Sequence, residues 1–257
     1  MTAAAVRPTT LIPSPRAAAD SAPVPAELAA PRDPSAGRAA AYQRVLHQLV
    51  RRELRLLSDL AAWAPPDDGE RIGTLTRHSE LISRVLLHHH AVEREAVWPA
   101  LLRAVPRDRE DDVRSAVVEW TDRCARMDHL LRDLTTAARQ WEVARTDPAR
   151  ESFATACAVL AVTVETQTAD EEAVLLPLLD RYLHADDWAA IARSSHCKLS
   201  GREQLLVLGL ALEDSCAGDR ARLLGGLSPS ARVAWRLHGR RNYRAAVVKL
   251  RGAPPAS

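Results

Sequence analysis

The feature that most restricts the fold is a stretch without glycine, which runs from Thr74 to Ser200 in a chain of 257 residues. Tight hairpins and phosphate-binding loops need glycine where the backbone turns sharply, so neither suits this stretch. Ala, Leu, Arg and Glu abound in it and favour helices, whereas the β-branched and aromatic residues typical of sheets are sparse. We therefore expect an all-α protein.

Apolar residues recur at the spacing of one helix face in four long segments. These segments cover residues 38–63, 68–104, 109–144 and a fourth that starts at Asp147-Pro148. Pro65-Pro66 and Pro106 should end the first two helices, and Pro99 should interrupt the second. Four long helices with short connections predict an antiparallel up-down-up-down four-helix bundle over residues 38–184.

The remaining residues divide into three parts. Residues 1–37 are rich in Ala and Pro, show no apolar period and are expected to be disordered. Residues 185–251 should form a C-terminal extension of two or three helices, with breaks near Ser200-Gly201, Gly218 and Gly225-Gly226. Residues 252–257 form a short tail.

The net charge of +2 conceals an asymmetry between the end of the chain and the rest. Residues 220–257 hold nine Lys or Arg and no Asp or Glu, which leaves 26 basic against 33 acidic groups elsewhere. We interpret this as a basic C-terminal helix that docks on an acidic body. Nucleic-acid binding is disfavoured, because no aromatic platform or known motif accompanies the charge.

Two further observations bear on location. No apolar run reaches the roughly 18 residues that a membrane-spanning helix needs, so no membrane span is expected. The four cysteines include no C-x-x-C pair and follow no secretory segment, which predicts a reduced, cytoplasmic protein.

Residues 89–99 and 167–177 repeat one pattern, with a glutamate in the fifth position and a proline in the eleventh. In the first copy the fifth position is Glu93, so His89 and Glu93 stand four residues apart on one helix face and can reach the same ion. That face belongs to the apolar stripe and should point inward. A buried His beside a buried Glu is costly unless the two are paired or bound to metal.

At these positions the sequence resembles the hemerythrin-like, or HHE cation-binding, family over about residues 38–184. The resemblance rests on His47-x-x-x-Arg51, on His89-His90 with Glu93 and Trp98-Pro99, and on Glu171-Glu172 with Leu176-Pro177. It implies a helical bundle around a non-haem di-iron centre. Members of the family bind or sense dioxygen or nitric oxide, store or repair iron, or act on peroxide.

The family pattern implies metal ligands at His47, His89, Glu93 and Glu171. Gln167 stands where the family has a histidine on its fourth helix. On the third helix, Cys124 should stand at the position of a ligand in place of His129, because Cys124 lies on the apolar stripe and His129 lies off it. The spacing from Cys124 to Gln167 also resembles that from His47 to His89. The predicted ligand set is therefore completed by Cys124 and Gln167, around one or two iron ions.

Simpler interpretations exist for several of these residues. His47 could be a hydrogen-bonded core histidine and Cys124 a plain core cysteine. His88 and His90 should lie at helix interfaces, His78 should be a buried hydrogen-bonding group, and Cys157 stands too far along its helix to join the centre.

Three functions remain open at this point. The first is an iron protein that binds dioxygen or nitric oxide. The second is an iron-dependent oxidase or oxygenase of a small molecule, because the altered ligand set could leave coordination positions open. The third is a metal-free regulatory scaffold.

Overall fold

The computed structural model describes residues 37–195 and 198–255, and every regular element within these two ranges is helical. This confirms the all-α prediction. The predicted disordered segment, 1–37, lies outside the described residues except for Gly37. The first elements are α1 (Arg38–Trp63), α2 (Gly69–Val92), the π-helical turn η2 (Glu93–Val97), α3 (Trp98–Ala104), η3 (Arg107–Arg109), α4 (Glu110–Ala144), α5 (Asp147–Val174) and α6 (Leu176–Tyr182).

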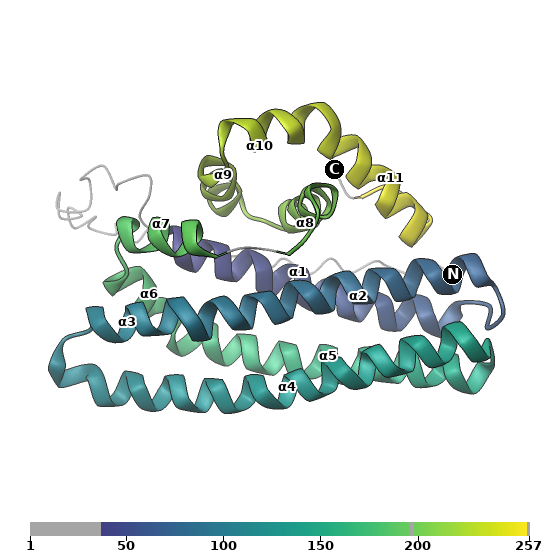
Figure 1. Ribbon diagram of the computed structural model, residues 1–257, viewed down its shortest axis with the longest axis horizontal. Helices are drawn as coiled ribbons and strands as arrows, with labels where there is room; N and C mark the ends of the chain where they lie inside the picture. Colours follow the sequence, from purple (N-terminus) through teal and green to yellow (C-terminus); the bar gives the residue numbers. More distant parts are fainter. Residues whose placement is uncertain (1–36, 196–197, 256–257) are drawn as a thin grey trace, which may run out of the picture. The chain divides into compact units, whose positions relative to one another are not determined.

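The four long helices α1, α2, α4 and α5 lie side by side (Figure 1). Each packs against two of the others: α1 against α2 and α5, and α4 against α2 and α5. Their inward faces carry the apolar stripes seen in the sequence, and Leu54, Leu75, Met127 and Leu160 are among the side chains with no exposed surface. The interior of this helical bundle is where the candidate ligands also lie.

The second long helix departs from its predicted course near the repeat. It does not break at Pro99 but loosens one turn earlier, at η2, where the N–H of Trp98 bonds to the carbonyl of Glu93. Proline lacks an N–H and its ring clashes with the carbonyl four residues back, so the wider turn accommodates Pro99 without ending the helix. Such π-turns often mark functional sites.

The fourth helix begins at Asp147, with Thr146 as the residue that precedes its first turn. The same helix is interrupted at Leu175, just before Pro177, and continues as α6. The proline of each repeat copy therefore marks a local change of helix geometry close to Glu93 and Glu171.

The C-terminal extension contains more helices than expected. Its elements are α7 (Ala185–Ser194), α8 (Gly201–Glu213), α9 (Ala217–Gly226), α10 (Pro229–Ala234), the π-turn η4 (Trp235–Gly239) and α11 (Arg240–Arg251). The last three are continuous, so the described residues hold four helical segments here rather than two or three. Ser200 caps α8 and Cys216 caps α9, so the predicted breaks near Ser200-Gly201 and Gly218 lie at the starts of these helices, and Gly218 itself is in the first turn of α9.

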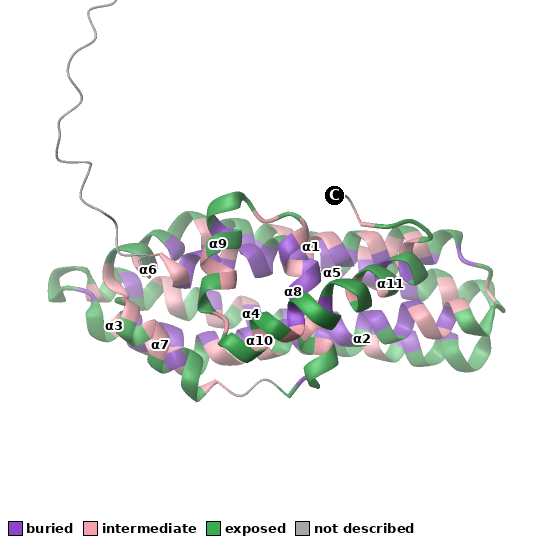
Figure 2. Cartoon of the chain, turned by 90° about the horizontal axis from the view of Figure 1, so that it is seen from above, coloured by how far each residue is buried: buried purple, intermediate pink, exposed green. Residues whose placement is uncertain are grey.

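Basic side chains of α11 contact the bundle. Lys249 Nζ lies 2.9 Å from Glu70 Oε1, and Arg251 Nη2 lies 2.7 Å from Glu53 Oε1. Residues of α8, α9 and α11 pack on α1 and α2, whereas exposed residues cover much of α10 and α11 (Figure 2). These contacts agree with the interpretation of a basic helix docked on an acidic body.

Glu53 on α1 is fully buried and gathers three donors. His78 Nε2 is 2.8 Å from one of its oxygens, while Arg52 Nε and Arg251 Nη2 each lie 2.7 Å from the other. Burial alone would raise the pKa of this carboxyl, but the hydrogen bond from His78 and the charges of the two arginines lower it to about 2. His78 is thus the buried hydrogen-bonding group that the sequence predicted.

Within residues 37–195 and 198–255, no helix combines the length and the apolar character that crossing a membrane requires.

Candidate metal centre

Four of the predicted ligands converge in the interior of the bundle. His47 comes from α1, His89 from the end of α2, Glu93 from the first position of η2 and Glu171 from α5. One ligand atom of each lies within 4.8 Å of those of the others, and all four residues are at most 4% exposed. Ligand atoms around one first-row metal ion are separated by at most about 4.4 Å, so small side-chain movements suffice to bind an ion.

The individual distances show which atoms face one another. His47 Nε2 is 3.3 Å from His89 Nε2 and 3.5 Å from Glu171 Oε1. His89 Nε2 is 3.4 Å from Glu93 Oε2. Two ring nitrogens that face each other at this distance can share at most one hydrogen bond. The arrangement is the one expected of two imidazoles that are aimed at a shared ion.

Each carboxylate of the cluster has one oxygen held by the protein and one oxygen without a hydrogen-bond partner among the described residues. Gln43 Nε2 donates to Glu93 Oε1 at 2.5 Å, and Trp120 Nε1 donates to Glu171 Oε2 at 3.0 Å. Glu93 Oε2 and Glu171 Oε1 are buried and accept no hydrogen bond from residues 37–195 or 198–255. Such orphaned oxygens are costly. A cation between them would satisfy both, so this donor set fits a metal ion.

The ionisation of the cluster in the absence of a metal also favours a bound cation. Burial, and then the nearby His47, hold the pKa of His89 well below its usual value. Burial, and then the adjacent Glu171, raise the pKa of Glu93 well above its usual value. The buried site therefore disfavours charge on both groups, and a divalent cation would reverse the effect on Glu93 by stabilising its carboxylate.

Glu172, next in sequence to Glu171, orients His47. Its Oε1 lies 3.0 Å from His47 Nδ1 and 3.0 Å from Arg51 Nη2. A carboxylate that accepts from one imidazole nitrogen fixes the tautomer in which the other nitrogen can bind a metal. The motif that contains Glu172 was visible in the sequence, but this positioning role was not.

Removing Glu172 should weaken metal binding without removing a ligand. We expect E172A to lower the affinity for metal by about 10- to 100-fold, and E172Q, which keeps an acceptor for His47 Nδ1, to lose less. Isothermal titration of the metal-free protein measures both. E151A, which alters an exposed glutamate on the same helix, should leave the affinity unchanged, and equal affinities for all three variants would show that Glu172 orients nothing.

Cys124 and Gln167 bond to each other rather than joining the four-residue cluster. Gln167 Nε2 donates to Cys124 Sγ at 2.9 Å. Burial, and then the charge of Glu93, raise the pKa of the Cys124 thiol, which keeps it protonated. Gln167 Oε1 is buried and has no hydrogen-bond partner within the described part of the chain. His129 is exposed and contacts Arg132, in agreement with its predicted outward position.

The two other candidate interface histidines lie outside the cluster. His90 is buried, with its Nδ1 3.3 Å from Asp128 Oδ1, and His88 is half-buried. The sequence pattern did not identify Gln43 and Trp120 as the groups that hold the two carboxylates. Helical spacing could have found them, because Gln43 precedes His47 by four residues and Trp120 precedes Cys124 by four.

Comparison with known proteins agrees with this site. The family model described as the hemerythrin HHE cation binding domain matches residues 40–179, more than half of the chain. The chain therefore belongs to the hemerythrin HHE cation-binding family, and His47, His89, Glu93 and Glu171 all lie within the matched residues. No curated protein and no solved structure matches it.

Proposed function

We propose that this protein binds iron at His47, His89, Glu93 and Glu171 and uses it to bind dioxygen or nitric oxide in the cytoplasm. The observation that carries the proposal is the pair of buried carboxylate oxygens without partners, which face two imidazole nitrogens. In this proposal, residues 38–184 form an up-down-up-down four-helix bundle that holds the metal, and residues 185–251 form a helical extension.

Iron suits this donor set. Two imidazoles with carboxylates are typical ligands of non-haem Fe(II), and they leave coordination positions open for an exogenous ligand. A ferrous ion would supply reversible binding of diatomic gases or one-electron chemistry with dioxygen. We assign one ion to the four residues, because Cys124 Sγ already accepts a hydrogen bond from Gln167 and the two side chains offer a second ion no charged ligand.

The protein's own groups would control what reaches such an ion. Gln43, Trp120 and Glu172 hold the ligand side chains in place through the contacts described above. The buried apolar stripes of the four long helices exclude bulk water, which lowers the local dielectric constant and strengthens every charge interaction in the site.

Metal analysis with optical spectroscopy tests the proposal. The protein purified from iron-replete medium should contain iron, and the ferrous form should change its absorption spectrum under nitric oxide and under air. A return to the ferrous spectrum when the gas is removed indicates a binding protein, whereas gas consumption only with an organic substrate indicates an oxidase or oxygenase. Absence of iron, zinc and manganese would contradict the proposal and favour a metal-free scaffold.

A further inference from the structure

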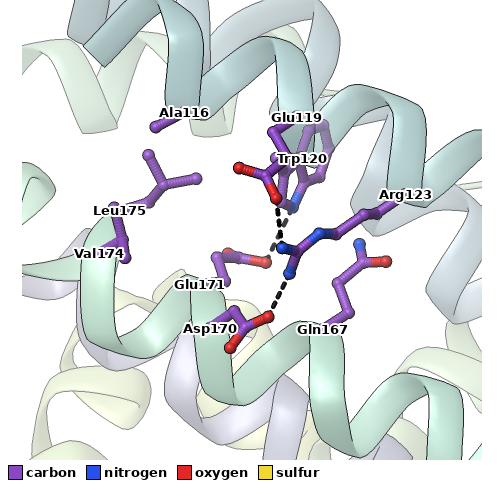
Figure 3. A pocket seen from close by; sticks show the side chains of 9 residues that line it. All are labelled: Ala116, Glu119, Trp120, Arg123, Gln167, Asp170, Glu171, Val174 and Leu175. Carbon is purple, nitrogen blue, oxygen red and sulfur yellow. Dashed lines mark hydrogen bonds and ion pairs between the residues drawn. The ribbon is translucent and has the colours of Figure 1, made fainter. Parts of the chain in front are cut away.

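A small pocket opens between α4 and α5, and Glu171 of the candidate metal centre is one of the residues that line it (Figure 3). Its walls include the aliphatic side chains of Ala116, Val174 and Leu175, and Glu171 and Gln167 also line it. Its volume is about 70 Å³. That is room for two or three water molecules, and far below the roughly 300 Å³ or more of pockets for drug-sized molecules.

The deep part of the pocket contains polar groups that the protein leaves incompletely paired. Gln167 is 5% exposed, and its Oε1 has no hydrogen-bond partner among the residues that the structure describes, although its Nε2 donates to Cys124 Sγ. Glu171 is 4% exposed, and its Oε1 also has no hydrogen-bond partner among these residues. Trp120, which also lines the pocket, fixes the other oxygen of Glu171.

The rim of the pocket is crossed by one arginine. The guanidinium of Arg123 on α4 bonds to Glu119 on the same helix and to Asp170 on α5 (Figure 3). These partners are solvent-exposed, with 67% and 53% of their side chains accessible. Exposed ion pairs are worth only about 0.2–1 kcal/mol each, so this bridge can open and close readily.

We infer that this pocket is the access route by which a small uncharged ligand reaches the metal centre, and that Arg123 is its gate. The inference rests on the proposed function, because it takes Glu171 at the inner end of the pocket as a metal ligand. It adds a route and a gating residue that the four-residue cluster by itself does not specify.

Size and charge select the ligand. A volume of about 70 Å³ admits a molecule of two or three heavy atoms and excludes larger organic substrates. The rim holds two carboxylates against one guanidinium and the inner end adds Glu171, so the route repels anions. Aliphatic walls suit a neutral, weakly hydrated molecule. Dioxygen, nitric oxide and hydrogen peroxide share these properties.

Three variants of the iron-loaded protein test the route with stopped-flow absorption, using nitric oxide on the ferrous form and azide on the ferric form. R123A removes the gate, and nitric oxide should associate faster. Because R123A also leaves two uncompensated carboxylates, the ratio of the nitric oxide rate to the azide rate should rise by about fivefold, the effect of one unit charge at about 4 Å in water. A116F fills the pocket and should slow both probes.

The matched control is R114A, which removes another exposed arginine of α4 whose partner, Glu110, is also four residues away. It should change neither rate. Iron content should be equal in all these variants, because none alters a proposed ligand. If iron is bound but R123A and A116F leave both association rates unchanged, the inference is overturned while the proposed function stands.

A second measurement needs no metal. Gln167 lines the pocket and donates to Cys124 Sγ, so hydrogen peroxide, which has two heavy atoms, should reach this thiol through the pocket. In the metal-free protein, oxidation of the Cys124 thiol by hydrogen peroxide to a sulfenic acid, with release of water, should be faster in R123A and slower in A116F when it is followed by peptide mass spectrometry. The exposed Cys216 is an internal control whose oxidation should not change. Equal oxidation of Cys124 in both variants and the wild type would also overturn the route, even if no metal binds.

Discussion

Replacement of both Glu93 and Glu171 by glutamine should abolish metal binding and leave the helical fold intact. Glutamine keeps the size of the side chain and an acceptor oxygen for the donors Gln43 and Trp120, but it removes the negative charges that a cation requires. The amide is a weak neutral ligand, and two imidazoles alone hold a divalent ion poorly.

The same double variant should not cost stability in the absence of metal. Burial and the neighbouring Glu171 already raise the pKa of Glu93, so the metal-free wild type contains two acidic groups in mutual conflict. Glutamine removes this conflict, keeps the volume of each side chain and still accepts from Gln43 and Trp120. The free energy of unfolding of the metal-free variant should therefore equal or exceed that of the metal-free wild type.

Elemental analysis and denaturant unfolding followed by circular dichroism measure the two effects. The double variant E95Q/E151Q is the control, because Glu95 and Glu151 are exposed residues of η2 and α5, the elements that carry the ligands. It should retain metal. Retention of metal by E93Q/E171Q would show that the carboxylates are not ligands, and a large loss of stability would show that they are structural.

Replacement of Glu53 by alanine should be strongly destabilising. It leaves His78, Arg52 and Arg251 without their shared acceptor at a fully buried position, and removal of one partner from a buried ion pair costs about 3–5 kcal/mol. Chemical unfolding measures the loss. D59A, at an exposed position of the same helix, should change the free energy of unfolding little.

Glu53 should also make the stability of the protein depend on pH in the acid range. Its pKa in the folded state, about 2, lies below the ordinary 4.5. The stabilisation is therefore complete above pH 4.5 and is lost as the pH falls from there toward 2. The shift corresponds to about 3 kcal/mol at about 1.4 kcal/mol per pKa unit. E53Q should flatten unfolding stability over this range, and an unchanged acid slope would contradict the assignment.

The long helices could be predicted from the sequence because their signals are local. Prolines and the apolar period define α1 from Arg38 to Trp63, and the structure has the same bounds. The π-turn at Glu93–Val97 was not predicted from the sequence. Its cause is the strain that Pro99 imposes on the preceding carbonyls. Either a break in the helix or a wider turn can relieve that strain, and the sequence does not distinguish the two.

The candidate site was partly predictable for the same reason. His89 and Glu93 share a helix face at a spacing of four, which is a local relation. The groups that hold the ligands, such as Gln43 and Glu172, act across helices, and their contacts depend on side-chain geometry that a repeat does not encode. The hydrogen bond between Cys124 and Gln167 is likewise a contact between α4 and α5, whereas the sequence pattern suggested that each could face an ion.

The most direct test of the metal assignment is an anomalous diffraction map from crystals of the iron-loaded protein, recorded above and below the iron absorption edge. The iron-specific peak should lie between the Nε2 atoms of His47 and His89 and the carboxylate oxygens of Glu93 and Glu171. A peak bonded to Cys124, a peak on surface carboxylates only, or no peak in crystals of protein shown to contain iron would contradict the assignment.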